Sequence, residues 1–397
     1  MNIQLPEISC TGCGACMQTC KHGAITMEPH EDGFLYPHIN MKQCIRCGQC
    51  MKSCHALDSI NMLNKPLSCY AAQTRNEDVL YHSTSGGLFY ALATCIFEKK
   101  GIVYGCIFDE HYNAIIKRAE SVEQLAPMHG SKYVWSSSSE SYSEVLQDLK
   151  AGRTVMYSCL PCQAAGLRKY LRKPYDNLYI VDVLCGGAPS PFAFQEYLRT
   201  LTDEAGKRNL RFQFRDKDRY GTGVNCTYFV NGKKHHETWL ENSFYFAFSS
   251  KSRITWRRSC YGCNYKSIAR VSDITIGDYW GVEKYHKAFN SKDGVSVVLI
   301  NSDKGSELLD QIKSRIIMEE SNVFHVIERN SLVKEIEEGH IHEPEHRSKF
   351  FQMLSLKGWK AVDRKYLNRR QKIMMKQILI NISGRIQHKF IHKLNRG

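Results

Sequence analysis

Two stretches near the N-terminus share one cysteine spacing: CTGCGACMQTC at residues 10–20 and CIRCGQCMKSC at residues 44–54. Both follow the pattern C-x2-C-x2-C-x3-C, and the second begins 34 residues after the first. Three closely spaced thiolates can cap one face of a four-iron cluster, and the fourth cysteine of such a run normally ligates the other cluster. The doubled run therefore predicts two [4Fe–4S] clusters in a ferredoxin-like module.

The exchange of fourth cysteines assigns the eight thiolates to two sets. The first set is Cys10, Cys13, Cys16 and Cys54, and the second is Cys20, Cys44, Cys47 and Cys50. Zinc is the alternative metal, because it also takes four thiolates, but its sites usually combine two separate CxxC pairs. The repeated ferredoxin-type run favours iron–sulfur clusters.

Length and composition indicate a multidomain protein of a reducing compartment. The chain has 397 residues and 17 cysteines, and its first residues lack the basic and apolar segments of a signal peptide. Clustered cysteines without an export signal are typical of metal ligands in the cytoplasm. The longest apolar stretch, around residues 88–97, is far below the ~20 residues that a membrane-spanning helix needs. We therefore expect a soluble cytoplasmic protein.

The net charge of +14 is concentrated at the C-terminus. From Arg347 onward the chain has 14 Lys and Arg residues but only one acidic residue, Asp363. Residues 345–397 are predicted to form a basic helical tail, with an apolar stripe that includes Leu379 and Ile386. Packing of this tail on its own body or on a partner is one interpretation. Peripheral contact with the inner face of an anionic membrane is a second, and nucleic-acid binding is disfavoured because no matching motif accompanies the charge.

The order of predicted elements indicates a mixed fold, α+β or α/β. Residues 1–65 form the cluster module, with two short strands at residues 25–29 and 33–37. The body divides into a region at 67–145 and a region at 150–325. Helices and strands alternate in it, with helices predicted at residues 88–99, 140–149 and 191–201 and strands at 102–108, 154–157 and 178–184. Loops between residues 210 and 230 favour an antiparallel insertion.

Four further segments are expected where loops follow strands, the usual place for ligands in α/β proteins. They are Cys159-Leu160-Pro161-Cys162-Gln163, Cys185-Gly186-Gly187-Ala188-Pro189, Cys260-Tyr261-Gly262-Cys263 and residues 273–281. Together they offer enough thiolates for a third metal site. The remaining cysteines, which are Cys69, Cys95, Cys106 and Cys226, lie in apolar or strand contexts, where we expect a structural role.

An ordered set of motifs resembles the coenzyme F-420 hydrogenase/dehydrogenase beta-subunit family, here preceded by a two-cluster ferredoxin domain. The motifs are Ser85-Gly86-Gly87, Gly130-Ser131-Lys132-Tyr133-Val134, Pro161-Cys162-Gln163, Asp182-Val183-Leu184-Cys185, Cys260-Tyr261-Gly262-Cys263 and residues 273–281. The resemblance covers roughly residues 1–320. It implies a flavoprotein that holds FAD beside a [4Fe–4S] cluster.

The resemblance also implies which residues bind these groups. The third-cluster ligands it implies are Cys162, Cys185, Cys260 and Cys263. Cys159 stands where related sequences usually have glycine, and it offers an alternative to Cys185.

The Ser85-Gly86-Gly87 turn at a helix start suits a flavin phosphate, although glycines also serve tight turns. Lys132 would pair with that phosphate or polarise the flavin ring; its alternative is a solvated loop lysine. Asp273 and Asp278 flank a strand end, where they would position a cofactor or partner, or form a turn.

These features predict an FAD- and [4Fe–4S]-dependent oxidoreductase. It would transfer electrons between its ferredoxin-type clusters and a small-molecule two-electron carrier, with a ferredoxin or another redox protein as partner. The alternative is a non-catalytic electron-relay subunit that feeds a separate catalytic protein.

Overall fold

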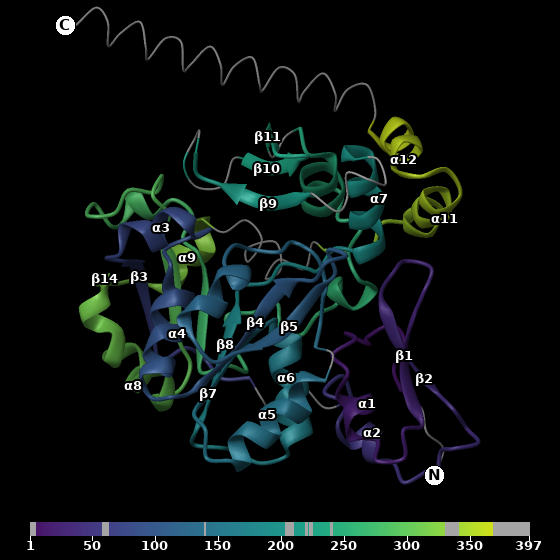
Figure 1. The fold of residues 1–397 in the computed structure, drawn as a ribbon, viewed down its shortest axis with the longest axis horizontal. Coiled ribbons are helices and arrows are strands. Elements are labelled where there is room, and N and C mark those ends of the chain that lie inside the picture. The colour runs from purple at the N-terminus through teal and green to yellow at the C-terminus, as the bar shows by residue number, and fades with distance from the viewer. Residues whose placement is uncertain are drawn as a thin grey trace, which may run out of the picture.

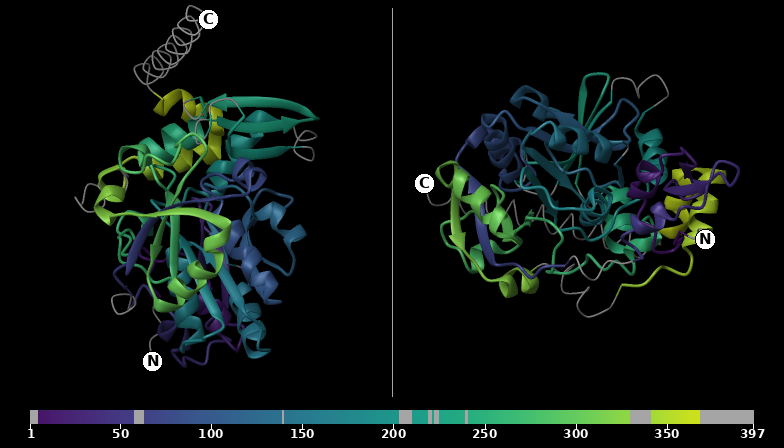
Figure 2. Two further views of the ribbon diagram at one scale, coloured as in Figure 1. Left: turned by 90° about the vertical axis from the view of Figure 1, so that its left-hand side faces the viewer. Right: turned by 90° about the horizontal axis from the view of Figure 1, so that it is seen from below.

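The computed structural model describes residues 5–57, 63–138, 140–202, 210–218, 221, 225–238, 241–329 and 341–367. A large mixed sheet forms the centre of the body, and the N-terminal module lies beside it (Figure 1). A small antiparallel sheet and the C-terminal helices lie at one end of the body (Figures 1 and 2). Among the described residues, no helix is long and apolar enough to cross a membrane.

The N-terminal module pairs a short hairpin with two short helices. The hairpin strands are β1 (Ile25–Pro29) and β2 (Leu35–Ile39), which run antiparallel, as predicted from the sequence. The helices are α1 (Ala15–Thr19) and α2 (Gln49–Lys52), and each contains one cysteine of its run. Each helix begins after a glycine with left-handed φ, 77° at Gly14 and 73° at Gly48. These glycines let the chain turn sharply between successive cysteines.

The central sheet has nine described strands in the order β14-β3-β13-β12-β8-β7-β4-β5-β6. Their bounds are β3 (Ser68–Thr74), β4 (Ile102–Phe108), β5 (Ala114–Ala119), β6 (Ser136–Ser137), β7 (Val155–Cys159), β8 (Leu178–Val183), β12 (Ile274–Asp278), β13 (Ser296–Ile300) and β14 (Ile316–Glu320). The neighbours β4, β7, β8 and β12 run parallel, and β13 runs antiparallel to both β12 and β3. The carboxyl ends of β3, β12, β8, β7 and β4 therefore share one edge of the sheet. Strands from the predicted regions 67–145 and 150–325 interleave, because β3 lies between β14 and β13.

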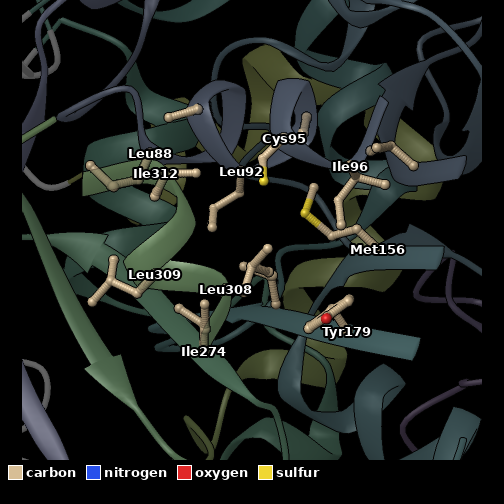
Figure 3. Close-up of a cluster of buried hydrophobic side chains, with 14 of the residues drawn as sticks. Leu88, Leu92, Cys95, Ile96, Met156, Tyr179, Ile274, Leu308, Leu309 and Ile312 are labelled. Carbon is tan, nitrogen blue, oxygen red and sulfur yellow. The ribbon is translucent and has the colours of Figure 1, made fainter. Parts of the chain in front are cut away.

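Helices cover both faces of this sheet, so its parallel strands are apolar on both sides. On one face, α4 (Leu88–Glu98) and α8 (Asp303–Ile312) bury Leu92, Ile96 and Leu308 against alternate strand residues such as Met156 and Tyr179 (Figure 3). On the other face, α5 (Ser141–Lys150) and α6 (Pro161–Leu171) cover a core that contains the intervening residues Val155 and Tyr157. The predicted helices at 88–99 and 140–149 correspond to α4 and α5.

Shorter helical segments complete the body. They are α3 (Glu77–His82), η2 (Val122–Met128), η5 (Arg258–Cys260), η6 (Val282–Lys284), η7 (Lys313–Arg315) and α9 (Val323–Arg329).

An aromatic core joins the insertion to the C-terminal helices. The insertion is a three-stranded antiparallel sheet of β9 (Arg211–Asp216), β10 (Asn225–Val230) and β11 (Lys233–Thr238), as predicted for this part of the chain. With α7 (Pro191–Leu201), the π-helix η4 (Ser243–Lys251), α11 (Arg347–Lys357) and α12 (Trp359–Tyr366), it surrounds Phe194, Phe212, Phe244, Phe350 and Trp359.

The first part of the predicted basic tail is thus helical and packed on the body. The rest of that tail, including Leu379 and Ile386, lies outside the described residues.

Candidate functional site: cysteine groups and a cationic edge

Four cysteines from three segments line one cavity at the carboxyl edge of the sheet. Cys162 lies in the first turn of α6, Cys185 follows β8, Cys260 ends η5, and Cys263 comes three residues later. The segment at 260–263 thus follows a helical turn, and its predicted position after a strand is wrong. Within the described ranges no three His, Cys, Asp or Glu side chains converge as ligands of a single ion do. The four thiols instead surround a cavity.

The turn that presents Cys162 is fixed by its neighbour Gln163. The Gln163 side-chain oxygen accepts a hydrogen bond from the Leu160 backbone N–H at 3.0 Å, and its amide nitrogen donates to the Ser136 carbonyl at 2.9 Å. Pro161 occupies the first position of α6, where a missing N–H costs no hydrogen bond. The Pro-Cys-Gln motif is therefore a helix start that aims Cys162 at the cavity.

Burial and mutual repulsion disfavour thiolates in this cavity. Burial raises the pKa of Cys185 to about 12, with further rises from Cys260 and Cys263. Burial also raises the pKa of Cys263 to about 11, and the Cys260 thiolate adds to it. The pKa of Cys162 is raised well above its ordinary value by burial and then by the other three thiols. Four buried thiolates are stable together only beside compensating positive charge, which a metal centre supplies.

Cys159 is separate from this group. It is the last residue of β7, and its side chain belongs to the buried core under α5 and α6. Burial, followed by the nearby Asp182 carboxylate, raises the pKa of its thiol well above the ordinary value. Among the described residues that line the cavity, Cys185 is present and Cys159 is not.

The eight N-terminal cysteines form two sets across the repeat. Burial raises the pKa of Cys16, and the thiols of Cys13, Cys10 and Cys54 raise it further. The pKa of Cys50 is likewise raised by burial and then by Cys44 and Cys20. The fourth cysteine of each run therefore lies close enough to the other run to raise the pKa of a thiol there. Two-cluster ferredoxin spacing predicts this arrangement. Cys47 is the exposed member of the second set.

The first of these sets lies against the body cavity. The pKa of Cys162 is raised in part by Cys13, and α1 packs directly on α6 (Figure 1). The Trp135 indole N–H donates to the Thr11 carbonyl at 3.1 Å, and the Arg257 Nε donates to the Cys10 carbonyl at 2.7 Å. Arg257 and Trp135 also line the cavity, so they close the space between the two cysteine groups.

His55 also contributes to the contact between the N-terminal module and the body. Its two ring nitrogens lie 2.9 Å from the Thr11 hydroxyl and 2.7 Å from the Tyr265 hydroxyl. Burial lowers the pKa of His55 to about 4, so the ring is neutral and bridges the two modules. Sequence reasoning missed Arg257 and Tyr265.

The Ser85-Gly86-Gly87 turn follows α3 and lies beside the end of β3 at the same edge of the sheet, where the Thr74 N–H donates to the Gly86 carbonyl at 2.7 Å. A Cβ on Gly86 would lie 2.4 Å from the Ala72 carbonyl oxygen, and Gly87 has φ +76°. Packing and turn geometry therefore require both glycines. The Ser131 N–H donates to the Thr84 hydroxyl at 2.9 Å, which brings the Gly130–Val134 segment beside this turn.

Lys132 is half-buried and its ammonium group lies among backbone carbonyls, so the interpretation as a solvated loop lysine is wrong. The ammonium group donates to the carbonyls of Pro127 and His129 at 2.8 Å and of Gly130 at 3.1 Å. Burial lowers the pKa of Lys132 to about 8. The three carbonyls hold the cation at the end of η2, next to the turn at 85–87.

Arg215 is a buried cation at this edge that sequence reasoning missed. Its side chain is 4% exposed and pairs with Asp278 at 2.5 Å, while its guanidinium lies 5.2 Å from the Trp280 ring centre. Its Nε and Nη2 atoms have no hydrogen-bond partner among the described residues. Asp278 ends β12, but Asp273 precedes that strand and accepts from the Ile180 N–H at 2.8 Å. The two aspartates thus lie at opposite ends of β12. Of the two, Asp278 lies at the carboxyl edge of the sheet that holds Lys132 and Arg215, which we call the cationic edge.

Comparison with known proteins identifies two domains. Residues 152–324 match the family described as the C terminus of the beta subunit of coenzyme F420 hydrogenase/dehydrogenase, and residues 9–56 match the 4Fe-4S dicluster domain. The chain thus carries a C-terminal domain of this beta-subunit family together with a 4Fe-4S dicluster domain. All four cavity cysteines fall inside the beta-subunit match, and the eight N-terminal cysteines fall inside the dicluster match.

Two curated relatives are similar to this chain over most of its length. The coenzyme F420-dependent sulfite reductase of Methanocaldococcus jannaschii is 22% identical over 351 residues, which are 83% of this chain and 50% of that protein. The chain thus spans half the length of that relative. A subunit of the F(420)H(2) dehydrogenase of Methanosarcina mazei is 22% identical over 325 residues, 78% of this chain and 84% of that protein.

A solved structure is also similar to this chain. It is a chain of the F420-reducing nickel–iron hydrogenase complex from Methanosarcina barkeri, 16% identical with a TM-score of 0.45. The match covers 70% of this chain and 91% of that chain.

Proposed function

We propose that this protein is an iron–sulfur flavoprotein oxidoreductase, which transfers electrons between ferredoxin-type [4Fe–4S] clusters and a two-electron carrier through FAD. One observation carries the proposal: the first cysteine set lies directly against the cavity that four further cysteines line. Cys13 is within the electrostatic field of Cys162 across the α1–α6 contact. Redox centres held by these cysteines would be near neighbours.

Three clusters would be held by twelve cysteines. The proposed ligands are Cys10, Cys13, Cys16 and Cys54 for the first cluster, Cys20, Cys44, Cys47 and Cys50 for the second, and Cys162, Cys185, Cys260 and Cys263 for the third. The donor set fits, because soft thiolates are the usual ligands of such clusters and the raised thiol pKa values call for positive charge. Arg257 and Trp135 shield the first and third groups from water.

FAD would bind along the cationic edge of the sheet. The proposed binding residues are Ser85, Gly86, Gly87 and Lys132, to which we add Arg215. The unpartnered Nε and Nη2 atoms of Arg215 fit an anionic oxygen of the cofactor, since buried guanidinium donors are costly to leave unpaired. When bound, a flavin exchanges two electrons with a hydride donor and single electrons with iron–sulfur centres.

The carrier would be coenzyme F420 or a similar small molecule, because the two curated relatives are named for F420-linked reactions. A second function, a relay subunit that feeds a separate catalytic protein, is favoured by the relative from Methanosarcina mazei, which is itself named as part of a larger dehydrogenase. Under the first function, the purified protein reduces added F420 when supplied with dithionite. Under the second, it takes up electrons but reduces F420 only with its partner.

The direct test is anaerobic purification followed by metal, sulfide and flavin analysis. Three four-iron clusters and one FAD require about twelve irons, about twelve sulfides and about one flavin per chain. Stoichiometric zinc without inorganic sulfide would overturn the proposal. About twelve irons per chain without flavin would agree with the cluster assignment but contradict the assignment of the protein as a flavoprotein.

A further inference from the structure

The second cysteine set lies on the outward side of the N-terminal module, among exposed cations. Lys21 follows Cys20, Arg46 lies between Cys44 and Cys47, and Lys42 and Lys52 lie two residues from Cys44 and Cys50. All four cations are exposed. No carboxylate of a described residue forms an ion pair with them, and the sequence has no acidic residue between Asp32 and Asp58.

Exposed apolar side chains accompany these cations. Met41 is 52% exposed and Ile45 is 62% exposed, and each neighbours one of the cations in sequence. Cys47 is exposed as well, so the ligand set itself reaches the surface. We call the surface formed by Lys21, Met41, Lys42, Ile45, Arg46 and Lys52 the outer face. It combines exposed apolar side chains with positive charge that no described carboxylate pairs, a composition that suits docking of an acidic protein.

The first cysteine set has fewer neighbouring cations. The residues between Cys10 and Cys16 are uncharged, and Lys52, which is two residues from both Cys50 and Cys54, is the cation that the two sets share. Arg257 and Gly166 of the body pack against Cys10 and Cys13. Among the described cysteines of this module, Cys47 on the outer face is the one classed as exposed.

We propose that the outer face docks an acidic one-electron carrier protein of the ferredoxin class. The inference rests on the proposed function, because it requires a cluster held by Cys20, Cys44, Cys47 and Cys50. The carrier would give up one electron and be oxidised, and the cluster that those four cysteines would hold would take up that electron and be reduced; no bond would form or break. Positive charge on the outer face attracts the carrier's carboxylates and speeds their encounter. Met41 and Ile45 provide the apolar contact that holds the complex.

Binding of a redox-inactive carrier tests the docking separately from electron transfer. The probe is an acidic ferredoxin in which gallium replaces iron, titrated into the full chain at low salt. The reversal variant K42E/R46E is expected to bind about tenfold or more weakly than the wild type, and Ile45→Ser about threefold more weakly at every salt concentration. The matched control K233E/K357E makes the same charge change at exposed positions on β11 and α11, and we expect wild-type affinity. Basic cytochrome c should not bind the wild type.

The outcomes separate this inference from the proposed function. Wild-type affinity of K42E/R46E, or equal weakening of both charge variants, would overturn the docking site even if iron and flavin analysis succeeds. If the reversals reduce iron content, K42Q/R46Q replaces them, with an expected loss of about threefold in affinity. Absence of iron and sulfide from the wild type would instead overturn the proposed function, whatever the ferredoxin titration shows.

Discussion

Cys13 of the N-terminal module packs directly on Gly166 of α6. A Cβ on Gly166 would lie 2.8 Å from the Cys13 sulfur and 2.8 Å from the Tyr142 hydroxyl. Real Cβ atoms do not approach so closely, so only glycine at this position permits the contact. The contact brings a proposed ligand of the first cluster next to the turn that holds Cys162.

Gly166→Ala is therefore expected to destabilise the protein, although alanine is the better helix former by ~1 kcal/mol. The methyl group must displace Cys13 or Tyr142, which costs about 1–3 kcal/mol in a packed core. Thermal unfolding under anaerobic conditions should show a lower midpoint, and electron paramagnetic resonance should show a changed N-terminal cluster signal. Gly262→Ala is the control for the unfolding midpoint alone, since no atom outside its chain neighbours lies within 4 Å of its added Cβ and since Gly262 lies between two proposed ligands of the third cluster. An unchanged midpoint and signal in Gly166→Ala would contradict the contact.

Two alanine substitutions separate the cysteines of the Cys159–Cys162 segment. Cys162→Ala should lower the iron content from about twelve to about eight per chain, because the third cluster loses a ligand. Cys159→Ala should keep about twelve irons, because that side chain lies in the core away from the cavity. Iron and sulfide analysis of the two variants, purified in parallel, measures this directly. Loss of iron from Cys159→Ala would instead show that Cys159, at the end of β7, is a ligand of the third cluster.

Local sequence signals predicted the regular elements well. The strand at 102–108 and the helix at 191–201 match β4 and α7 to the residue. At α7 the reason is visible, because Ser190 caps the helix by accepting from the Ala193 N–H at 3.0 Å and Pro191 occupies the first helical position. The alternation of apolar elements likewise predicted a mixed α/β body.

The missed residues depend on contacts that are distant in sequence. Arg257 reaches Cys10, which is 247 positions away, and Arg215 pairs with Asp278 across 63 positions. No local pattern marks either arginine, since each side chain is buried only after separate segments assemble. The choice between Cys159 and Cys185 was similarly hidden, because it depends on which of the two side chains lines the cavity once β7, α6 and the segment after β8 assemble.

A buried ion pair ties the C-terminal helices to the ferredoxin hairpin, and its removal should be costly. Arg347 in α11 lies 2.8 Å from Asp32 in the turn between β1 and β2, and the two side chains are 3% and 2% exposed. Figure 1 shows α11 beside the turn between β1 and β2. Arg347→Met leaves a buried carboxylate without its cation, so we expect a loss of about 3–5 kcal/mol in the free energy of unfolding.

Chemical denaturation of these variants provides the measurement. Arg364→Met is the control, because Arg364 is exposed on the adjacent helix α12 and should change stability by less than about 0.5 kcal/mol. The double variant Asp32→Leu/Arg347→Met should be more stable than Arg347→Met alone, since neither charge is then left unpaired. Equal stability of Arg347→Met and Arg364→Met would show that the pair contributes nothing.

Lys132 should give the protein a pH dependence that a methionine variant lacks. Burial lowers its pKa from 10.5 to about 8 in the folded state. Between these pH values the unfolded chain binds more protons than the folded chain, so the free energy of unfolding rises with pH. The difference in free energy of unfolding between the wild type and Lys132→Met should rise with pH, with a slope that approaches about 1.4 kcal/mol per pH unit. Chemical denaturation at a series of pH values from about 7.5 to 10 measures this slope. The exposed Lys117→Met is the control and should parallel the wild type. If the free energy of unfolding varies with pH in the same way in the wild type and in Lys132→Met, Lys132 is not held as a desolvated cation. Loss of flavin from Lys132→Met would support the proposed contact of Lys132 with the FAD phosphate.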